Sequence, residues 1–210
     1  MPYRRSAEAP SSETLVVSFE TAILSLVRRF RNHPYAFYTE TDMHCYLYHR
    51  LYKPLFNVLY RTSEGHDTIL LHKEYPTVSR YTREPDRKLK TDPVGRRRGR
   101  FDISIWDPAF IRERAHRQQK VLCAAELALN ECGEDSVHTV NDATKLADPG
   151  NEIKYGYLLY FVRDNPDYKR NERKIRQELD DAAKRVRVVI ARVEGKSKPK
   201  PEYLGAWGAV

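Results

Sequence analysis

The stretch Val121–Leu129 limits the possible folds more than any other part of this sequence. It reads VLCAAELAL, and Glu126 is its only charged residue. A short run of nearly continuous apolar character is typical of a central strand that is buried on both faces of a sheet. Such a strand needs neighbours on both edges and helices over both faces. We therefore expect the rest of the chain to fold around it.

Helical and strand patterns alternate around this stretch. Apolar residues at helical spacing predict a helix over Thr14–Phe30, which Pro34 ends. They also predict a second helix from Thr39 toward Leu59, with a capping box at its start and a kink or interruption at Pro54. The remaining patterns predict strands over Thr68–Tyr75, which Pro76 closes, and over Phe101–Asp107, Gly156–Val162 and Val186–Val193. They predict helices over Ser136–Ala147 and Glu172–Lys184. The order α-α-β-β-β-α-β-α-β predicts an α/β fold with a mixed central sheet flanked by helices.

The 210 residues suggest one domain with small appendages. Residues 1–12 are rich in serine and proline and predict a flexible tail. We expect the α/β domain over residues 13–194, with a basic loop at 82–100 that Pro and Gly punctuate. Residues 195–210 form a linker followed by a short apolar tail. That tail either docks on its own domain or on a second chain, so a homodimer is one of two alternatives.

The net charge of +8 is concentrated in two regions. Nine basic residues face three acidic ones between Arg80 and Arg100, and thirteen face seven between Arg163 and Lys200. Two basic regions on a slightly acidic body are the pattern of a polyanion binder, which makes nucleic acid the expected partner. The alternative is that both regions are ordinary solvated surface.

We expect a cytoplasmic protein that does not cross a membrane. No apolar run approaches the roughly 20 residues that a membrane-spanning helix needs. The segment Met1–Pro10 holds no apolar stretch of the kind found in secretory signals. Cys45, Cys123 and Cys132 are an odd set without close spacing, which argues against a disulfide framework and favours a reducing compartment.

Three carboxylates occupy positions where a carboxylate is costly. Glu126 interrupts the apolar run, Asp102 lies on a strand between Phe101 and Ile103, and Glu40 extends the apolar stripe of the second helix. Structural explanations exist for each: an arginine partner for Glu126, a strand-edge or turn position for Asp102, and a favourable helix dipole for Glu40. Together the three carboxylates make a functional site the sharper hypothesis.

The segment GRFDISIWDP, followed by VLCAAELAL, resembles the PD-(D/E)XK nuclease superfamily, whose core is helix, three strands, helix, strand. The resemblance covers roughly residues 38–163. It implies a restriction-endonuclease-like fold and a Mg²⁺-dependent nuclease that hydrolyses phosphodiester bonds of DNA or RNA. It also implies that Asp102, Glu126 and Glu40 hold Mg²⁺ or Mn²⁺, since hard oxygen ligands suit these cations and the bound cation activates water.

One position departs from that resemblance. The family's pattern has a lysine two residues after the glutamate, and this chain has Ala128 there. We expect Lys145, on the following helix, to supply the catalytic ammonium, with Lys73 as second candidate. The alternative for Lys145 is a surface pair with Asp142, three residues earlier.

The basic loop and the tyrosines are further candidates for nucleic-acid binding. Arg96, Arg97, Arg98 and Arg100 precede the Asp102 strand and could meet phosphates that flank the site. Near the second helix, both helix packing and stacking on unpaired bases are open for a group of six tyrosines: Tyr35, Tyr38, Tyr46, Tyr48, Tyr52 and Tyr60.

Two rival hypotheses use the same residues. The first is a catalytically inactive relative that keeps the fold as a nucleic-acid-binding or protein-interaction module, which the missing lysine favours. The second is an unrelated α/β protein whose carboxylates are structural. A buried glutamate at position 126 favours the enzyme, because a binding module gains nothing from it.

Overall fold

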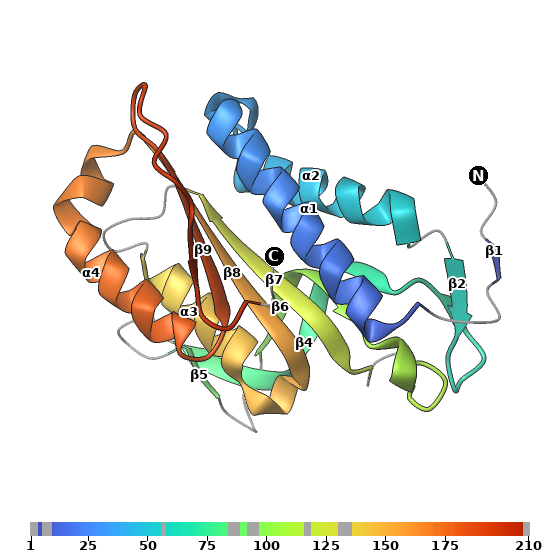
Figure 1. Ribbon diagram of the computed structural model, residues 1–210. Coiled ribbons are helices and arrows are strands. Elements are labelled where there is room, and N and C mark those ends of the chain that lie inside the picture. Colours follow the sequence, from blue (N-terminus) through green and yellow to red (C-terminus); the bar gives the residue numbers. More distant parts are fainter. Residues whose placement is uncertain are drawn as a thin grey trace.

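A computed structural model of the chain describes residues 4–5, 10–55, 58–83, 89–91, 97–115, 119–129 and 136–207. These residues form a mixed α/β fold built on a seven-stranded sheet of order β10-β9-β8-β7-β6-β4-β5 (Figure 1). The strands are β4 (Leu71–Arg83), β5 (Leu89–Thr91), β6 (Arg97–Trp106), β7 (Val121–Leu129), β8 (Ile153–Arg163), β9 (Arg187–Val193) and β10 (Glu202–Leu204). A separate small sheet joins β1 (Arg4–Arg5), β2 (Val58–Arg61) and β3 (Asp67–Thr68).

The central strand of the large sheet is β7, with the bounds that the apolar run predicts. It pairs antiparallel with β6 and parallel with β8, and β8 pairs parallel with β9. All of its residues except Leu129 are buried. The prediction of a strand that is covered on both faces is confirmed.

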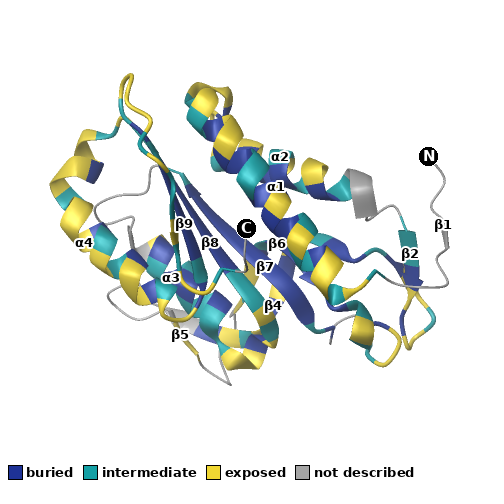
Figure 2. Ribbon diagram, in the orientation of Figure 1, coloured by how far each residue is buried: buried dark blue, intermediate teal, exposed yellow. Residues whose placement is uncertain are grey.

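Four helices cover the two faces of the sheet. On one side lie α1 (Ser12–Asn32) and α2 (Glu40–Leu55), and on the other lie α3 (Ser136–Ala147) and α4 (Pro166–Ala183) (Figure 1). Each helix turns a buried stripe toward the strands and an exposed stripe outward (Figure 2). This arrangement follows from apolar residues at helical spacing, because the stripe that faces the sheet is the one removed from water.

Capping residues set where the first two helices begin. The Ser11 side chain accepts a hydrogen bond from the Thr14 amide at the start of α1. At the start of α2 the Asp42 carboxylate accepts the amides of Tyr38 and Thr39, while the Thr39 hydroxyl accepts the Asp42 amide. The predicted capping box is confirmed. It fixes Glu40 in the first turn of α2.

Several predicted boundaries are wrong. The second helix does not run to Leu59: α2 ends at Leu55, next to the predicted interruption at Pro54, and Val58–Arg61 is β2. Pro76 does not close its strand: β4 continues to Arg83, with a register shift after Pro76. Pro76 itself stays in register opposite Arg100, and the irregular part of the ladder lies between Pro76 and Arg80.

The predicted basic loop is partly strand. Within residues 82–100, β5 and the start of β6 extend a ribbon with β4. The last helix begins at Pro166, before the predicted Glu172, because the Asn165 side chain accepts the Asp167 amide and Pro166 suits the first turn. No helix in the described part of the chain is long and apolar enough to cross a membrane.

A buried ion pair joins the two ends of the domain. Glu20 of α1 pairs with Arg187 of β9, and the Tyr157 hydroxyl of β8 donates to the Glu20 carboxylate at 3.0 Å. The Arg187 guanidinium also donates to the Ala206 carbonyl. Trp207 packs edge-on against Tyr157, with ring centroids 5.6 Å apart. The segment after β10 therefore docks on its own domain.

Candidate functional site

The site lies where β6 and β7 separate. Their ladder begins at the Ile103–Ala125 pair, and Asp102 stands one residue beyond it. There the Asp102 Oδ2 accepts a hydrogen bond from the Leu127 amide at 2.7 Å. A side chain thus satisfies a backbone donor that the ladder leaves open. This bond holds the Asp102 carboxylate against the strand that carries Glu126.

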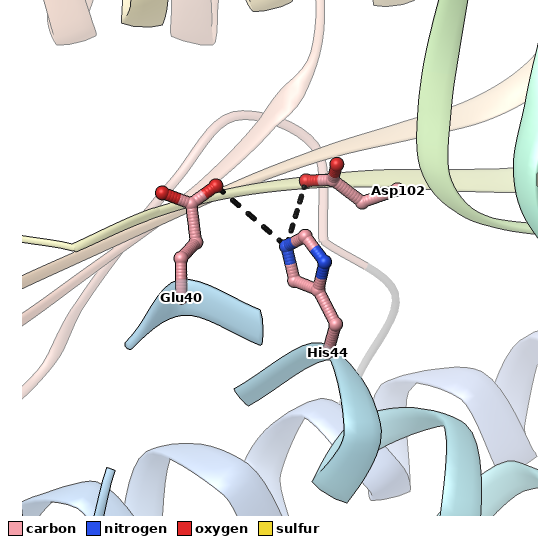
Figure 3. A group of neighbouring side chains, drawn as sticks. All are labelled: Glu40, His44 and Asp102. Atoms are coloured by element: carbon pink, nitrogen blue, oxygen red, sulfur yellow. Dashed lines mark ion pairs between the residues drawn. The ribbon is translucent and has the colours of Figure 1, made fainter. Parts of the chain in front are cut away.

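Helix α2 brings two more side chains to Asp102. Glu40 and His44 are four residues apart, so both point from the same face of the helix toward β6 (Figure 3). The His44 Nε2 lies 3.2 Å from Asp102 Oδ2 and 3.6 Å from Glu40 Oε1. One ligand atom from each of the three residues falls within 4.8 Å of the others. Two carboxylates and an imidazole at this spacing are a donor set for a metal ion.

The environment of His44 supports that interpretation. The residue is only 7 % exposed, and its Nε2 makes no hydrogen bond of regular geometry. Burial alone would lower the pKa of His44, but Asp102 and Glu40 outweigh burial and raise the pKa to about 9. The raised pKa keeps a proton on the ring at neutral pH, so a metal ion would occupy this cation-favouring place only by displacing that proton.

A second charged group lies on the other side of Asp102. Glu126 is 2 % exposed, and its Oε1 is 2.7 Å from the Lys145 ammonium of α3. The same ammonium is 2.8 Å from Asp142 Oδ1 and donates to the Arg100 carbonyl at 3.0 Å. Its three oxygen neighbours equal the three N–H donors that an ammonium carries.

The Lys145 ammonium pairs with two carboxylates, those of Glu126 and Asp142. Burial, together with the charge of Asp142, raises the pKa of Glu126 well above its usual range. Burial alone would lower the pKa of Lys145, but Glu126 and Asp142 outweigh burial and raise the pKa. Lys145 therefore stays charged, while the raised pKa of Glu126 favours its protonated form and so reduces the negative charge of the group.

Gly99 makes room for the lysine side chain. A Cβ placed at Gly99 would lie 2.8 Å from Lys145 Cδ and 3.2 Å from Thr77 Cγ2. Any residue other than glycine would therefore push the lysine stem away from its path to β7. Gly99 belongs to β6 and directly precedes Arg100, whose carbonyl accepts the ammonium proton.

A buried asparagine holds the end of α3 that carries Lys145. Asn151 Nδ2 donates to the Lys145 carbonyl at 2.8 Å and to the Tyr81 hydroxyl at 2.7 Å. Its Oδ1 accepts the Ser79 amide at 2.9 Å. These bonds tie α3 to β4, so the lysine starts from a fixed backbone.

The predicted site residues are brought together in two groups. Glu40 and Asp102 meet as expected, in the company of His44. Glu126 pairs instead with Lys145, and it does not belong to the three-residue group. Lys145 forms the expected pair with Asp142 as well, but both side chains are partly buried, with 11 % and 17 % exposed. The second candidate, Lys73, is exposed on β4.

Two arginines of the basic loop have described side chains. Arg98 and Arg100 are exposed on β6, and Arg100 is 3.9 Å from Glu74. Arg96 falls outside the described residues, and only the backbone of Arg97 is described.

The sequence interpretation missed His44. Its four-residue spacing from Glu40 was the one available signal, and the residue lies in the same buried stripe as Met43 and Leu47.

Comparisons of the chain with protein-family models, with curated proteins and with solved structures gave no match.

Proposed function

We propose that this chain is a metal-dependent nuclease with a PD-(D/E)XK-like, restriction-endonuclease-like core. The order α2, β4, β6, β7, α3, β8 agrees with the helix, three strands, helix and strand that the resemblance implies. Along the sheet, β4, β6, β7 and β8 are successive neighbours. Glu40, Asp102 and Glu126 occupy the helix and the two strands expected to carry the acidic residues.

The hydrogen bond from the Leu127 amide to Asp102 carries the proposal. Through it the Glu40–His44–Asp102 group and the Glu126–Lys145 pair become neighbours, because Leu127 directly follows Glu126. Hydrolysis of a phosphodiester needs positive charge where the phosphoryl oxygens gain negative charge. A cation site next to a fixed ammonium supplies that charge from two directions.

The donor set favours Mn²⁺ over Mg²⁺. Mg²⁺ prefers oxygen ligands, whereas imidazole nitrogen suits transition metals, and His44 offers such a nitrogen beside two carboxylates. A divalent cation bound here would polarise a phosphoryl oxygen and lower the pKa of a bound water. Lys145 takes the role of the family's lysine, whose position is Ala128 in this chain. It holds positive charge at the phosphate, while Glu126 and Asp142 orient its ammonium. Arg98 and Arg100 place exposed guanidinium groups on the same strand as Asp102, which suits flanking phosphates.

Cleavage assays with matched lysine variants test this function. Wild-type protein should cleave DNA or RNA in Mn²⁺, and Lys145→Ala should lower the rate by about 10²–10⁴. Binding of Mn²⁺ should be retained in Lys145→Ala, because the ammonium is not a ligand. Lys73→Ala is the control and should cleave like wild type. A wild-type protein that cleaves no nucleic acid in either metal contradicts the proposal.

The second candidate function is a catalytically inactive nucleic-acid-binding or protein-interaction module. Its supporting observation is that three protein oxygens already engage the Lys145 ammonium, while position 128 is alanine. If wild-type protein is inactive and Ala128→Lys cleaves nucleic acid, the catalytically inactive module is the correct function. If wild type cleaves and Lys145→Ala does not, the enzyme is correct.

A further inference from the structure

Of the aromatic side chains that the structure describes, the two most exposed lie on the segment between α1 and α2. Among the described residues, the exposed aromatics are Tyr35, which is 72 % exposed, Tyr38, which is 85 % exposed, and Tyr203, which is 40 % exposed. The tyrosines farther along α2, namely Tyr46, Tyr48 and Tyr52, pack against the core instead. Helix packing therefore accounts for Tyr46, Tyr48 and Tyr52, while Tyr35 and Tyr38 stay exposed, with the Arg163 guanidinium 5.6 Å from the Tyr35 ring centroid.

The backbone that carries Tyr35 and Tyr38 is held in place. The Arg163 guanidinium, at the end of β8, donates to the Phe37 carbonyl at 2.6 Å and to the Tyr38 carbonyl at 3.3 Å. Phe37 itself is buried against Tyr46, with ring centroids 5.6 Å apart. The two exposed rings thus stand on a fixed segment. A base that stacks on them therefore does not lose binding free energy to ordering that segment.

Cations lie on one side of the same segment, and the Asp42 carboxylate that accepts the Tyr38 and Thr39 amides lies on the segment's α2 side. Arg31, in the last turn of α1, donates to the Lys198 carbonyl at 2.9 Å and so joins the helix to the β9–β10 connection (Figure 1). Burial raises the pKa of Tyr203, and the nearby charges of Arg31 and Arg28 oppose that rise. We call this surface the basic end, and its cations are Arg28, Arg29, Arg31, Lys196, Lys198 and Lys200.

These cations have no acidic partners in the described structure. None of the six lies within 4 Å of a carboxylate of a described residue. Glu194, the acidic residue on the β9–β10 connection, is 3.8 Å from Lys169 of α4. Unpaired cations interleaved with exposed aromatic rings are the arrangement that binds a polynucleotide with unpaired bases. In a duplex the bases are already stacked on one another and offer no face to a tyrosine.

We propose that the basic end binds single-stranded nucleic acid, with its phosphates on the cations and its bases on Tyr35 and Tyr38. Tyr38 stands two residues before Glu40, so the strand is led to the Glu40–His44–Asp102 group. The binding itself stands on the surface alone. Only the delivery of the strand for cleavage rests on the proposed function.

Binding in EDTA tests this inference without any cleavage. The probe is a fluorescein-labelled oligothymidylate of about 12 nucleotides, within the range of single-strand site sizes, compared with the same strand annealed to oligodeoxyadenylate. Wild-type protein should bind the single strand at least about tenfold more tightly than the duplex. Replacement of both rings by Tyr35→Ala with Tyr38→Ala should remove about tenfold or more of the affinity. Tyr35→Phe with Tyr38→Phe should retain it, because the ring that stacks is kept.

Charge removal supplies the second arm. A triple variant with Lys196→Gln, Lys198→Gln and Lys200→Gln should weaken binding and flatten the slope of log affinity against log salt.

Its control removes three equal charges near the start of β8 and the end of α4, with Lys154→Gln, Lys184→Gln and Arg185→Gln, and should keep the wild-type slope. Equal affinity for duplex and single strand, alanine variants that bind like wild type, or a control that weakens as much would each overturn the inference. A protein that binds as expected in EDTA but never cleaves overturns the proposed function alone.

Discussion

The Lys145 ammonium lies 2.7 Å from the buried carboxylate oxygen of Glu126, although the two residues belong to different elements on either side of a crossover connection. On the strand itself, the position two residues after Glu126 is the fully buried Ala128. Helix α3 therefore supplies, through Lys145, the positive charge beside Glu126 that β7 does not supply. The first two predictions concern how this charge is held.

Loss of the ammonium should cost stability. Lys145→Met leaves Glu126 and Asp142 buried without a cation, so we expect the free energy of unfolding to fall by about 3–5 kcal/mol, as for other broken buried pairs. Adding Glu126→Gln to Lys145→Met should recover part of the loss, because one uncompensated carboxylate is removed. Urea unfolding followed by circular dichroism measures both variants. A loss below about 1 kcal/mol for Lys145→Met would show that the pair is solvated.

The space at Gly99 should be coupled to Lys145. Gly99→Ala places a methyl group 2.8 Å from Lys145 Cδ, and overpacking of this kind costs about 1–3 kcal/mol. In a Lys145→Ala background the colliding carbon is gone, so the same substitution should cost clearly less. A double-mutant cycle on unfolding free energies reads this coupling directly. Additive effects would mean that Gly99 does not shape the lysine's path.

Binding of a metal ion should depend on His44 and not on His49, the other histidine of α2. Mn²⁺ should raise the melting temperature of wild-type protein, because it binds the native state. His44→Ala should weaken Mn²⁺ binding by at least about tenfold, as measured by calorimetry. His49→Ala, an exposed histidine of the same helix, is the matched control and should bind like wild type. Equal loss in both variants would argue for nonspecific binding to α2.

Alkaline pH should weaken the Glu20–Tyr157–Arg187 group. Burial, helped by the neighbouring Cys123 and Glu20, raises the pKa of Tyr157 above the usual value of about 10 for a tyrosine. The native state therefore keeps the phenolic proton where the unfolded chain releases it, so the contribution to stability is full below about pH 10 and is lost as the pH rises further.

Tyr157→Phe is the variant that tests this pH dependence. At pH 8 it should be less stable than wild type by about 1.5–3 kcal/mol, because the hydroxyl bonds to charged partners. The difference should shrink above pH 10. Unfolding curves at several pH values give the difference, and a constant gap would contradict the assignment.

The fold was predictable where a single pattern decided the element. The run around Glu126 could only be a central strand, and α3 has the predicted bounds because its apolar spacing is uninterrupted. The errors lie where tertiary contacts override local signals. A proline favours the end of a strand, yet β4 passes through Pro76, which lies in register opposite Arg100 of β6.

The site was predictable only where a side chain was costly in its local context. Asp102 and Glu40 stood out as carboxylates among apolar neighbours. His44 did not, since a histidine on a buried helix face is a common core residue, and its meaning depends on Asp102, which lies on another element. The choice between Lys145 and Lys73 likewise depended on the space at Gly99, which no local pattern reveals.

The ion pair between Glu20 and Arg187 has a consequence for biosynthesis. Its two residues are 167 positions apart, so the pair cannot form until β9 has left the ribosome. At about 5–20 residues per second, α1 waits roughly 10–30 s with the acidic group of its sheet-facing side uncompensated. We expect nascent chains halted before Arg187 to remain sensitive to protease at α1, and chains extended past Trp207 to become resistant.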